Sequence, residues 1–459
     1  MQPPVEAKGM RVFILISIAQ FVSVVGSMLS SFALGVWIYQ KTNSATELAL
    51  ITLFATLPNV LVSPLAGAAV DRWDRRKTII LCECGLSLTT LTLAVLLQLG
   101  RLELWEIYLC TAINAVILSF LRLAYGAITP LLVPKEQLGR ASGVTQATFA
   151  AGQLLGPVLA GVLVTAIQIQ GVLLVDFISF FFPIVTLFLL QIPKPTITTE
   201  SAQARSSFRS EILFGWNYLR ARPGLLGLLW LFAATNLFAG IVVVLVNPLV
   251  LSFATPLMLG TVQSIAGVGM LVGSVVMGIW GGPKRRVLGI CGFMASTGVF
   301  MILAGLRPSI PLLAFAGFGA FFFMPIATGS IIALWQSKIA PDVQGRTGAV
   351  SGIFISISLP IASLIAGPLA DRVFEPLMAE GGLLAGSVGQ IMGVGPGRGI
   401  GLLFIVSGIA FLISIGLGYL NPRIRNVEAE LPDAFPSEPP AAVATEEAVL
   451  NPVGSVAVG

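Results

Sequence analysis

The sequence contains no histidine, and only 10% of its 459 residues are charged. The absence of histidine excludes a metal site built on imidazole ligands and a histidine proton relay, so any proton coupling must use carboxylates. The four cysteines, Cys82, Cys84, Cys110 and Cys291, all fall inside apolar runs. There we expect small packed side chains rather than a disulfide or a metal site, and we expect no cofactor.

Soluble domains carry about 25% charged residues, so a chain with 10% charged and 56% hydrophobic residues is typical of a membrane protein. Lipid admits only helices and closed barrels as spanning structures, and continuous rather than alternating apolar runs exclude a barrel. A helix needs about 20 apolar residues to cross. The sequence therefore predicts an all-α polytopic membrane protein with twelve transmembrane helices, at residues 12–38, 48–70, 78–98, 105–126, 142–166, 172–193, 225–251, 257–280, 287–306, 309–335, 347–372 and 399–420.

Basic residues predict the orientation of these helices. Six charges occur in the seven residues from Asp71 to Lys77, between the second and third apolar runs. Short loops rich in lysine and arginine stay in the cytoplasm, and with twelve crossings 21 of the 26 basic residues lie on that side. We therefore expect both termini in the cytoplasm and the protein in the plasma, or bacterial inner, membrane. The excess positive charge then faces anionic lipid, not nucleic acid.

An internal duplication is visible in three pairs of features, separated by 206 to 211 residues: loop-end arginines at Arg140 and Arg346, Gly-Pro pairs at Gly156 and Gly367, and Arg-Arg pairs at Arg75 and Arg285. The duplication predicts two six-helix pseudo-repeats, an arrangement in which secondary transporters build a site at the repeat interface. The predicted domains are an N-terminal bundle (1–193), a cytoplasmic linker with an amphipathic helix (194–224), a C-terminal bundle (225–422) and a disordered cytoplasmic tail (423–459).

The charged loop matches the pattern Gly-x-x-x-Asp-Arg-x-x-Arg-Arg at every position, at Gly67, Asp71, Arg72, Arg75 and Arg76. With this motif the chain resembles the major facilitator superfamily over residues 10–422, and is most similar to its branch of macrolide-efflux and enterobactin-export proteins. The resemblance implies a gating role, because in the family this loop latches the two halves in the outward-facing state. The second copy, at residues 281–286, lacks an acid, so we expect an asymmetric latch.

A second motif lies in the fifth apolar run. Gly152, Gly156, Pro157 and Gly161 resemble the antiporter motif Gly-x-x-x-Gly-Pro-x-x-Gly-Gly of this family, with Ala160 as the departure. Small residues four apart allow close helix contact, and proline permits a bend. The resemblance implies export by antiport rather than uptake. The glycine-rich stretch 393–399 is not followed by Lys-Ser or Lys-Thr, so we expect no nucleotide binding.

Two acids lie inside the predicted spans, Asp176 in span six and Glu83 in span three. An ionisable residue in lipid is costly and is by default a functional candidate. Removal from water favours the neutral carboxyl, which can then exchange a proton during transport. We predict Asp176 as the first candidate for proton coupling and Glu83 as the second. Two alternatives remain: either acid stabilises a helix amino terminus, or Glu83 pairs with Arg75 or Arg76.

The superfamily resemblance implies a substrate path along spans one, four, seven and ten. Its candidate residues are polar groups and an adaptable apolar wall: Gln20, Ser27, Ser31, Asn114, Asn236, Phe321, Phe322, Phe323 and Met324. For the phenylalanine and methionine side chains, ordinary packing is the alternative. A mostly uncharged lining predicts an amphipathic or lipophilic solute, drug-like or siderophore-like.

The sequence thus predicts a secondary active transporter, not an enzyme, that exports such a small molecule by proton antiport and alternating access. Its partners would be the solute, protons and the lipid bilayer, and we expect a monomer. Two alternatives remain open. One is a lysophospholipid-like flippase or facilitator of the same fold, whose transport would not respond to uncouplers. The other is a non-transporting membrane receptor or scaffold that acts through the tail.

Overall fold

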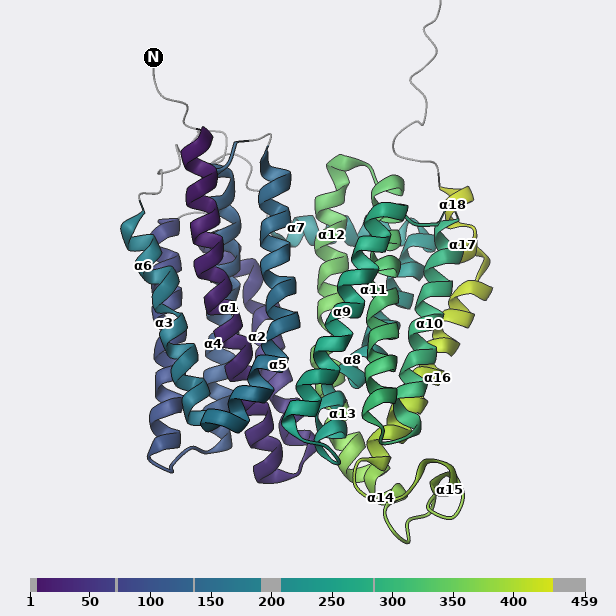
Figure 1. The fold of residues 1–459 in the computed structure, drawn as a ribbon. Coiled ribbons are helices and arrows are strands. Elements are labelled where there is room, and N and C mark those ends of the chain that lie inside the picture. The colour runs from purple at the N-terminus through teal and green to yellow at the C-terminus, as the bar shows by residue number, and fades with distance from the viewer. Residues whose placement is uncertain (1–5, 71–72, 135–136, 191–207, 284, 432–459) are drawn as a thin grey trace, which may run out of the picture.

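The computed structural model describes residues 6–70, 73–134, 137–190, 208–283 and 285–431, which form helices and loops without a strand (Figure 1). The amino-terminal half contains α1 (Glu6–Thr42), α2 (Ala45–Val70), α3 (Arg75–Gln98), α4 (Leu104–Leu132), α5 (Leu138–Ser179) and α6 (Phe181–Leu189). The carboxyl-terminal half contains α7 (Phe208–Arg220), α8 (Pro223–Leu251), α9 (Pro256–Trp280), α10 (Arg286–Leu306), α11 (Ile310–Lys338), α12 (Pro341–Ser356), α13 (Ser358–Leu369), the π-helical η3 (Ala370–Phe374), α14 (Glu375–Met378), α15 (Val388–Met392), α16 (Arg398–Leu420), α17 (Pro422–Arg425) and α18 (Val427–Glu430).

Eleven helical segments of the described chain are long and apolar enough to cross a membrane. One of them, Gly143–Leu189, has 47 residues, and a straight helix of that length would measure about 70 Å against about 30 Å of hydrocarbon. The backbone at Gln168 is non-helical, with φ 58° and ψ 179°, and forms a kink between two helical legs. Figure 1 shows α5 turning back toward α6. Counted as two crossings, this segment confirms the predicted total of twelve.

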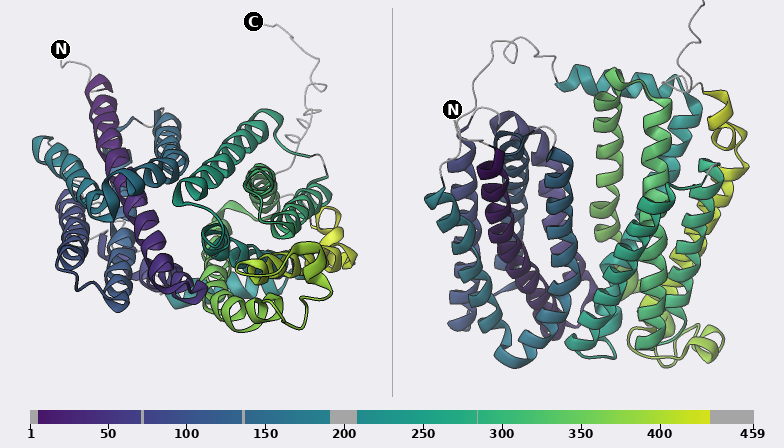
Figure 2. Two further views of the ribbon diagram at one scale, coloured as in Figure 1. Left: turned by 60° about the horizontal axis from the view of Figure 1, so that its bottom comes forward. Right: turned by 45° about the horizontal axis from the view of Figure 1, so that its top comes forward.

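The helices form two groups, as the internal duplication predicts. Figure 2 shows α1 to α6 gathered on one side and α8 to α16 on the other. The two described ends of the chain lie at the same end of the bundle (Figure 1). We call this end the termini face and the other end the opposite face. Two helix pairs provide most of the contact between the halves, α5 with α9 and α2 with α13.

The halves meet near the opposite face. A Cβ built on Gly161 of α5 would lie 3.0 Å from the Leu257 Cα at the start of α9, and one on Gly367 of α13 would collide with the Thr46 backbone at the start of α2. Toward the termini face, several glycines have no atom of another helix within 4 Å of a built Cβ: Gly67, Gly126, Gly143, Gly278, Gly345 and Gly348. The halves also diverge toward this face in Figure 1. The conformation is therefore closed at the opposite face and open at the termini face.

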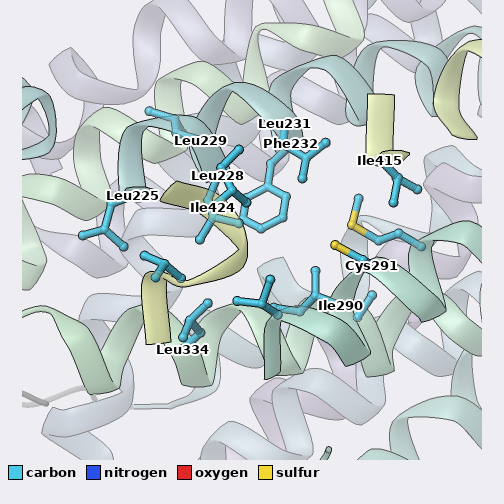
Figure 3. Close-up of a cluster of buried hydrophobic side chains, with 14 of the residues drawn as sticks. Leu225, Leu228, Leu229, Leu231, Phe232, Ile290, Cys291, Leu334, Ile415 and Ile424 are labelled. Carbon is cyan, nitrogen blue, oxygen red and sulfur yellow. The ribbon is translucent and has the colours of Figure 1, made fainter. Parts of the chain in front are cut away.

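A buried apolar cluster joins the helices of the carboxyl-terminal half, with Leu225 of α8, Ile290 of α10 and Ile424 of α17 among its members (Figure 3). This packing corrects the prediction of a disordered tail that starts at residue 423. Residues 423–431 belong largely to α17 and α18, because Ile424 and its neighbours bury apolar side chains against the core. Residues 432–459 of the predicted tail lie outside the described residues.

The predicted linker helix is present as α7, while residues 194–207 of the linker lie outside the described residues. Trp216 of α7 stacks on Phe354 of α12 with ring centroids 5.6 Å apart. The Arg346 guanidinium lies over the Phe214 ring at 4.8 Å. Besides any contact with lipid headgroups, the helix therefore packs on the first part of span eleven.

The amino end of α10 is capped by an acid from the far end of the chain. Its own N-cap residue, Arg285, makes no side-chain cap hydrogen bond. Instead the Glu428 carboxylate accepts from the backbone N of Arg286 at 2.8 Å and of Val287 at 3.4 Å. Glu428 thus supplies the negative charge that the second copy of the loop motif lacks.

The Glu428→Ala substitution should lower the free energy of unfolding by about 1 kcal/mol, because it leaves two amides at a helix terminus without an acceptor. Thermal unfolding of the detergent-solubilised protein should then show a melting temperature lower by about 1 to 4 °C. Glu430→Ala, an exposed acid in the same helix, is the matched control. Equal melting temperatures for the two variants would contradict the capping role.

Candidate functional site

Glu83 lies on α3 inside the amino-terminal half, and its side chain is 1% exposed. Its carboxylate accepts a hydrogen bond from Ser23 Oγ of α1 at 3.3 Å and another from Tyr125 Oη of α4 at 3.2 Å. The acid is therefore held where three transmembrane helices meet.

Asp176 lies on the second leg of α5, after the chain reversal, and is 2% exposed. Its carboxylate accepts from Thr90 Oγ1 of α3 at 3.2 Å and from Ser27 Oγ of α1 at 3.5 Å. Ser179, one turn further along α5, contributes a third hydroxyl at 3.5 Å. The side chain therefore contacts hydroxyls on three helix segments instead of amides at a helix amino terminus.

The two acids lie along one stripe of α1, because Ser23 and Ser27 are four residues apart and share a helix face. Each described hydrogen bond to either carboxyl comes from a hydroxyl, and none comes from a lysine or arginine. A buried carboxylate without a cationic partner is unfavourable, so this pair is the principal candidate site. Sequence reasoning found both acids but missed Thr90 and Tyr125; the available signal was a polar side chain inside an apolar span.

The arginines that could have paired with Glu83 bind helix carbonyls instead. Arg75 Nη1 donates to the Ala127 carbonyl of α4 at 2.9 Å. Arg76 donates through Nε to the Leu187 carbonyl at 2.8 Å and through Nη2 to the Phe188 carbonyl at 3.1 Å. The last carbonyls of a helix have no partner within the helix, so Arg76 satisfies the end of α6. Both arginines thus tie the loop to helices of their own half.

Two residues of the predicted gating motif, Asp71 and Arg72, lie outside the described residues. A Cβ built on Gly67 would have no neighbouring atom within 4 Å. Asp74, which sequence reasoning did not assign, caps α3 by accepting from two backbone amides at 3.1 and 3.2 Å. The gating role of the motif stays a prediction.

The predicted antiporter motif places its first two glycines against α1. A Cβ on Gly152 would lie 3.0 Å from Val24 Cγ1, and one on Gly156 would lie 2.9 Å from Met28 Cβ. Larger residues at either position would separate α5 from α1. The motif therefore fixes α5 on the helix that carries Ser23 and Ser27.

The second part of the same motif faces the other half of the protein. A Cβ on Gly260 of α9 would collide with the Pro157 carbonyl, and Gly161 approaches the backbone of Leu257. Nearby, Ser264 Oγ of α9 donates to the Leu154 carbonyl of α5 at 2.7 Å. The motif is thus in contact with α1 and with the half-to-half interface at once.

Gly26 allows the acid site to form. A Cβ at this position would collide with Ser179 Oγ and lie 2.9 Å from Asp176 Oδ1. The same glycine lines an apolar pocket of about 330 Å³ between α1, α5 and α6, together with Phe21, Val25, Leu29, Leu155, Leu159 and Phe182. Leu155 and Phe182 are 43% and 51% exposed, so the pocket opens on the outside of the helix bundle, next to Asp176.

The predicted substrate-path residues have different surroundings. Ser27 belongs to the acid site, and Asn114 Oδ1 accepts from Thr89 Oγ1 of α3 at 2.6 Å. Gln20 is half-buried. The exposed members of the set are Ser31, Asn236 and Met324. None of the predicted path residues lines the apolar pocket.

The aromatic residues of the predicted path pack inside the carboxyl-terminal half. The Phe323 ring lies 6.0 Å from that of Phe293 and 6.1 Å from that of Phe300, both on α10. The Phe322 and Phe323 rings meet edge to face at 5.0 Å, and Phe321 is half-buried. The contacts of Phe323 are therefore those of ordinary packing, the alternative to a place in the wall of a substrate path.

Comparisons with known proteins agree with the resemblance seen in the motifs. The sequence profile of the Major Facilitator Superfamily matches residues 16–363. The chain is 27% identical over 366 residues to macrolide efflux protein A of Streptococcus pyogenes, which covers 79% of this chain and 90% of that protein. It is 26% identical over 341 residues to the enterobactin exporter EntS of Salmonella choleraesuis, with 72% and 76% covered. The predicted branch is thereby confirmed.

Solved structures show the same fold at low sequence identity. A bacterial homologue of the human lysosomal transporter Spinster, in an inward-facing and unoccupied conformation, superposes with a TM-score of 0.67 at 13% identity and covers 94% of this chain and 99% of that one. The nucleoside transporter NupG gives 0.61 at 14% identity, with 88% and 98% covered. At such identities the likeness concerns the fold alone.

The Gly26→Ala substitution should cost about 1 to 3 kcal/mol of stability, because the added methyl group overlaps Ser179 and crowds the Asp176 carboxylate. Thermal unfolding in detergent measures the loss. Gly126→Ala, at a helical glycine with no neighbouring helix atom within 4 Å, is the control and should melt like the parent protein. An unchanged melting temperature for Gly26→Ala would show that α5 does not press the acid against α1.

Proposed function

Because the chain belongs to the Major Facilitator Superfamily and is an integral membrane transporter, we propose that it exports an amphipathic or lipophilic small molecule in exchange for protons. The single observation that carries the proposal is the pair of buried carboxyls, Asp176 and Glu83, held by hydroxyls without a described cationic partner.

Their surroundings suit proton exchange. With one bound proton each, the acids are neutral. A hydroxyl group can donate a hydrogen bond to the ionised carboxylate and can accept one from the protonated carboxyl, so it suits both states. A lysine or arginine partner would instead stabilise the ionised carboxyl through the whole cycle. A carboxyl that is neutral when buried and ionised when hydrated gains and loses a proton as access to water changes, which is what coupling to a gradient requires.

The direction of transport is inferred from the orientation and the relatives. We assign the termini face to the cytoplasm because 21 of 26 basic residues lie on that side under the twelve-helix topology. The conformation described above is then open to the cytoplasm, ready to load a solute for export. The macrolide-efflux and enterobactin-exporter relatives carry out transport in that direction, as their names state.

The class of solute follows from the lining residues. The apolar pocket beside Asp176 has almost wholly apolar walls, and the exposed polar members of the predicted path carry no charge. Such surfaces bind apolar groups and orient them through a few hydrogen bonds. The same pocket also supports a second candidate, a facilitator for lysophospholipid-like solutes, because it opens toward the region that lipid chains would occupy.

The Asp176→Asn and Glu83→Gln substitutions should uncouple export from the proton gradient. A proton that crosses 100 mV contributes about 2.3 kcal/mol, enough for a gradient of about fortyfold, and the variant that loses the coupling acid should equilibrate the solute without accumulating it. Proteoliposomes with an imposed gradient, a lipophilic dye as probe and a pH indicator inside would measure both fluxes.

Glu380→Gln, which removes an exposed acid, is the control and should keep full coupling. Coupled accumulation in both acid variants would refute the assignment of these carboxyls. Solute movement that ignores uncouplers in the parent protein would refute antiport and favour the lipid facilitator.

A further inference from the structure

One side chain at the opposite face connects the two halves with four hydrogen bonds. The Asp371 carboxylate in η3 accepts from Ser44 Oγ at 2.7 Å, from the backbone N of Ala45 at 3.1 Å, and from Thr46 N and Oγ1 at 2.9 and 2.7 Å. All four donors lie at the amino end of α2, on its first two residues and on Ser44, which immediately precedes it. Asp371 therefore caps a helix of the other half.

The backbone on both sides is fitted to this contact. Gly367, one turn before Asp371, comes so close to Thr46 that a Cβ there would collide with the Thr46 Cα and lie 3.2 Å from the Ala49 Cβ. A larger residue would push span eleven away from α2 and draw the carboxylate off the amides. Asp371 also lies in a π-helical turn, a rare local structure that is frequent at functional sites.

The sequence repeats the same hexapeptide pattern at the two ends of this helix pair. Gly67-x-x-x-Asp71-Arg72 ends α2, and Gly367-x-x-x-Asp371-Arg372 ends span eleven. Because α2 and span eleven run in opposite directions, Gly67 of the first copy lies toward the termini face and Asp371 of the second copy lies at the opposite face. Only the opposite face is closed in this structure.

The internal duplication shows that the acid at position 371 is present in span eleven but not in the corresponding helix of the amino-terminal half. Gly156-Pro157 corresponds to Gly367-Pro368, so Ala160 occupies the place of Asp371 in the amino-terminal half. The α5 segment around it also packs on the first turn of a helix in the other half, α9, where Thr255 of that same half accepts from the Met258 amide. α2 also has a cap residue of its own, because Ser44 Oγ accepts from the Glu47 amide at 3.2 Å, and Asp371 adds the acceptor for the amides of Ala45 and Thr46. Among the described hydrogen bonds, only span eleven provides an acid that caps a helix across the interface.

We propose that Asp371 is a gating residue: it holds the opposite face shut and thereby stabilises the conformation that is open at the termini face. When the halves separate at this face, the carboxylate loses four donors, and the first amides of α2 lose their acceptor. The inference rests on the proposed rocking of two halves, but it needs neither a proton gradient nor a solute, so failure of proton coupling would leave it intact.

The test measures distances between spin labels on the full-length protein in lipid nanodiscs. One label pair, at Lys77 and Arg285, reports the termini face, and another, at Arg101 and Leu383, reports the opposite face; all four positions are exposed. Cys84, the exposed member of the four cysteines, is first replaced by serine.

Asp371→Ala should raise the ratio of opposite-face-open to opposite-face-closed molecules by about tenfold or more, with the termini-face distance shortening in the same population. Asp371→Asn should shift the ratio less, because its amide oxygen still accepts. Glu375→Gln is the matched control. Glu375 caps α16 within one half, accepting from Gly397 N at 3.1 Å and Ile400 N at 3.0 Å, and its variant should keep the parent distances.

Unchanged distances at both faces in folded Asp371→Ala would overturn the proposal. An equal shift in Glu375→Gln would overturn it as well, since the effect would then come from loosening the carboxyl-terminal half. If Asp371→Ala proves too unstable to purify, Asp371→Asn decides: a partial shift supports the gating role, and parent distances reject it.

Discussion

Backbone groups at helix ends need hydrogen-bond partners even where a protein spans a membrane, and this constraint organises the polar contacts of the whole structure. Asp74 supplies acceptors for α3, Glu375 for α16 and Glu428 for α10, while Arg76 supplies donors for the end of α6. Each of these caps remains inside one half and stabilises it as a rigid body. The carboxylate that caps α2 comes from the other half. Its hydrogen bonds to the α2 amides can therefore form only while the two halves are in contact at this face.

The two buried acids differ from these capping residues in a way that matters for function. A capping carboxylate faces amides whose dipoles stabilise the ionised form. Asp176 and Glu83 instead face hydroxyl groups, which favour neither form strongly. These acids thus have two kinds of surroundings: backbone amides at helix ends for Asp74, Glu375 and Glu428, and side-chain hydroxyls for Asp176 and Glu83.

Much of the architecture could be predicted because lipid imposes strong rules on composition and charge. Apolar run length gave the twelve crossings, and the distribution of basic residues, together with an even number of crossings, placed the two ends of the chain on one face. The acids Asp176 and Glu83 were recognised because charge inside an apolar run is rare. The capping partners were not, since Asp371 and Glu428 act on amides more than 140 residues away in sequence, and no local pattern encodes such a pairing. For the same reason the tail was predicted to be disordered from residue 423, although Ile424 is buried in the core.

Both candidate coupling acids lie in the amino-terminal half, so the proposed coupling requires that protonation be communicated to an interface that neither acid touches. The contacts described above form a continuous route. The carboxyls bind Ser23 and Ser27 on α1, α1 packs on Gly152 and Gly156 of α5, and the next turns of α5 meet α9 across the interface. The glycine contacts on both sides of α5 leave little room for it to move independently, because interiors packed this closely shift as units. A change in the position of α1 would therefore move α5 against α9 and alter the same closed face that Asp371 holds together.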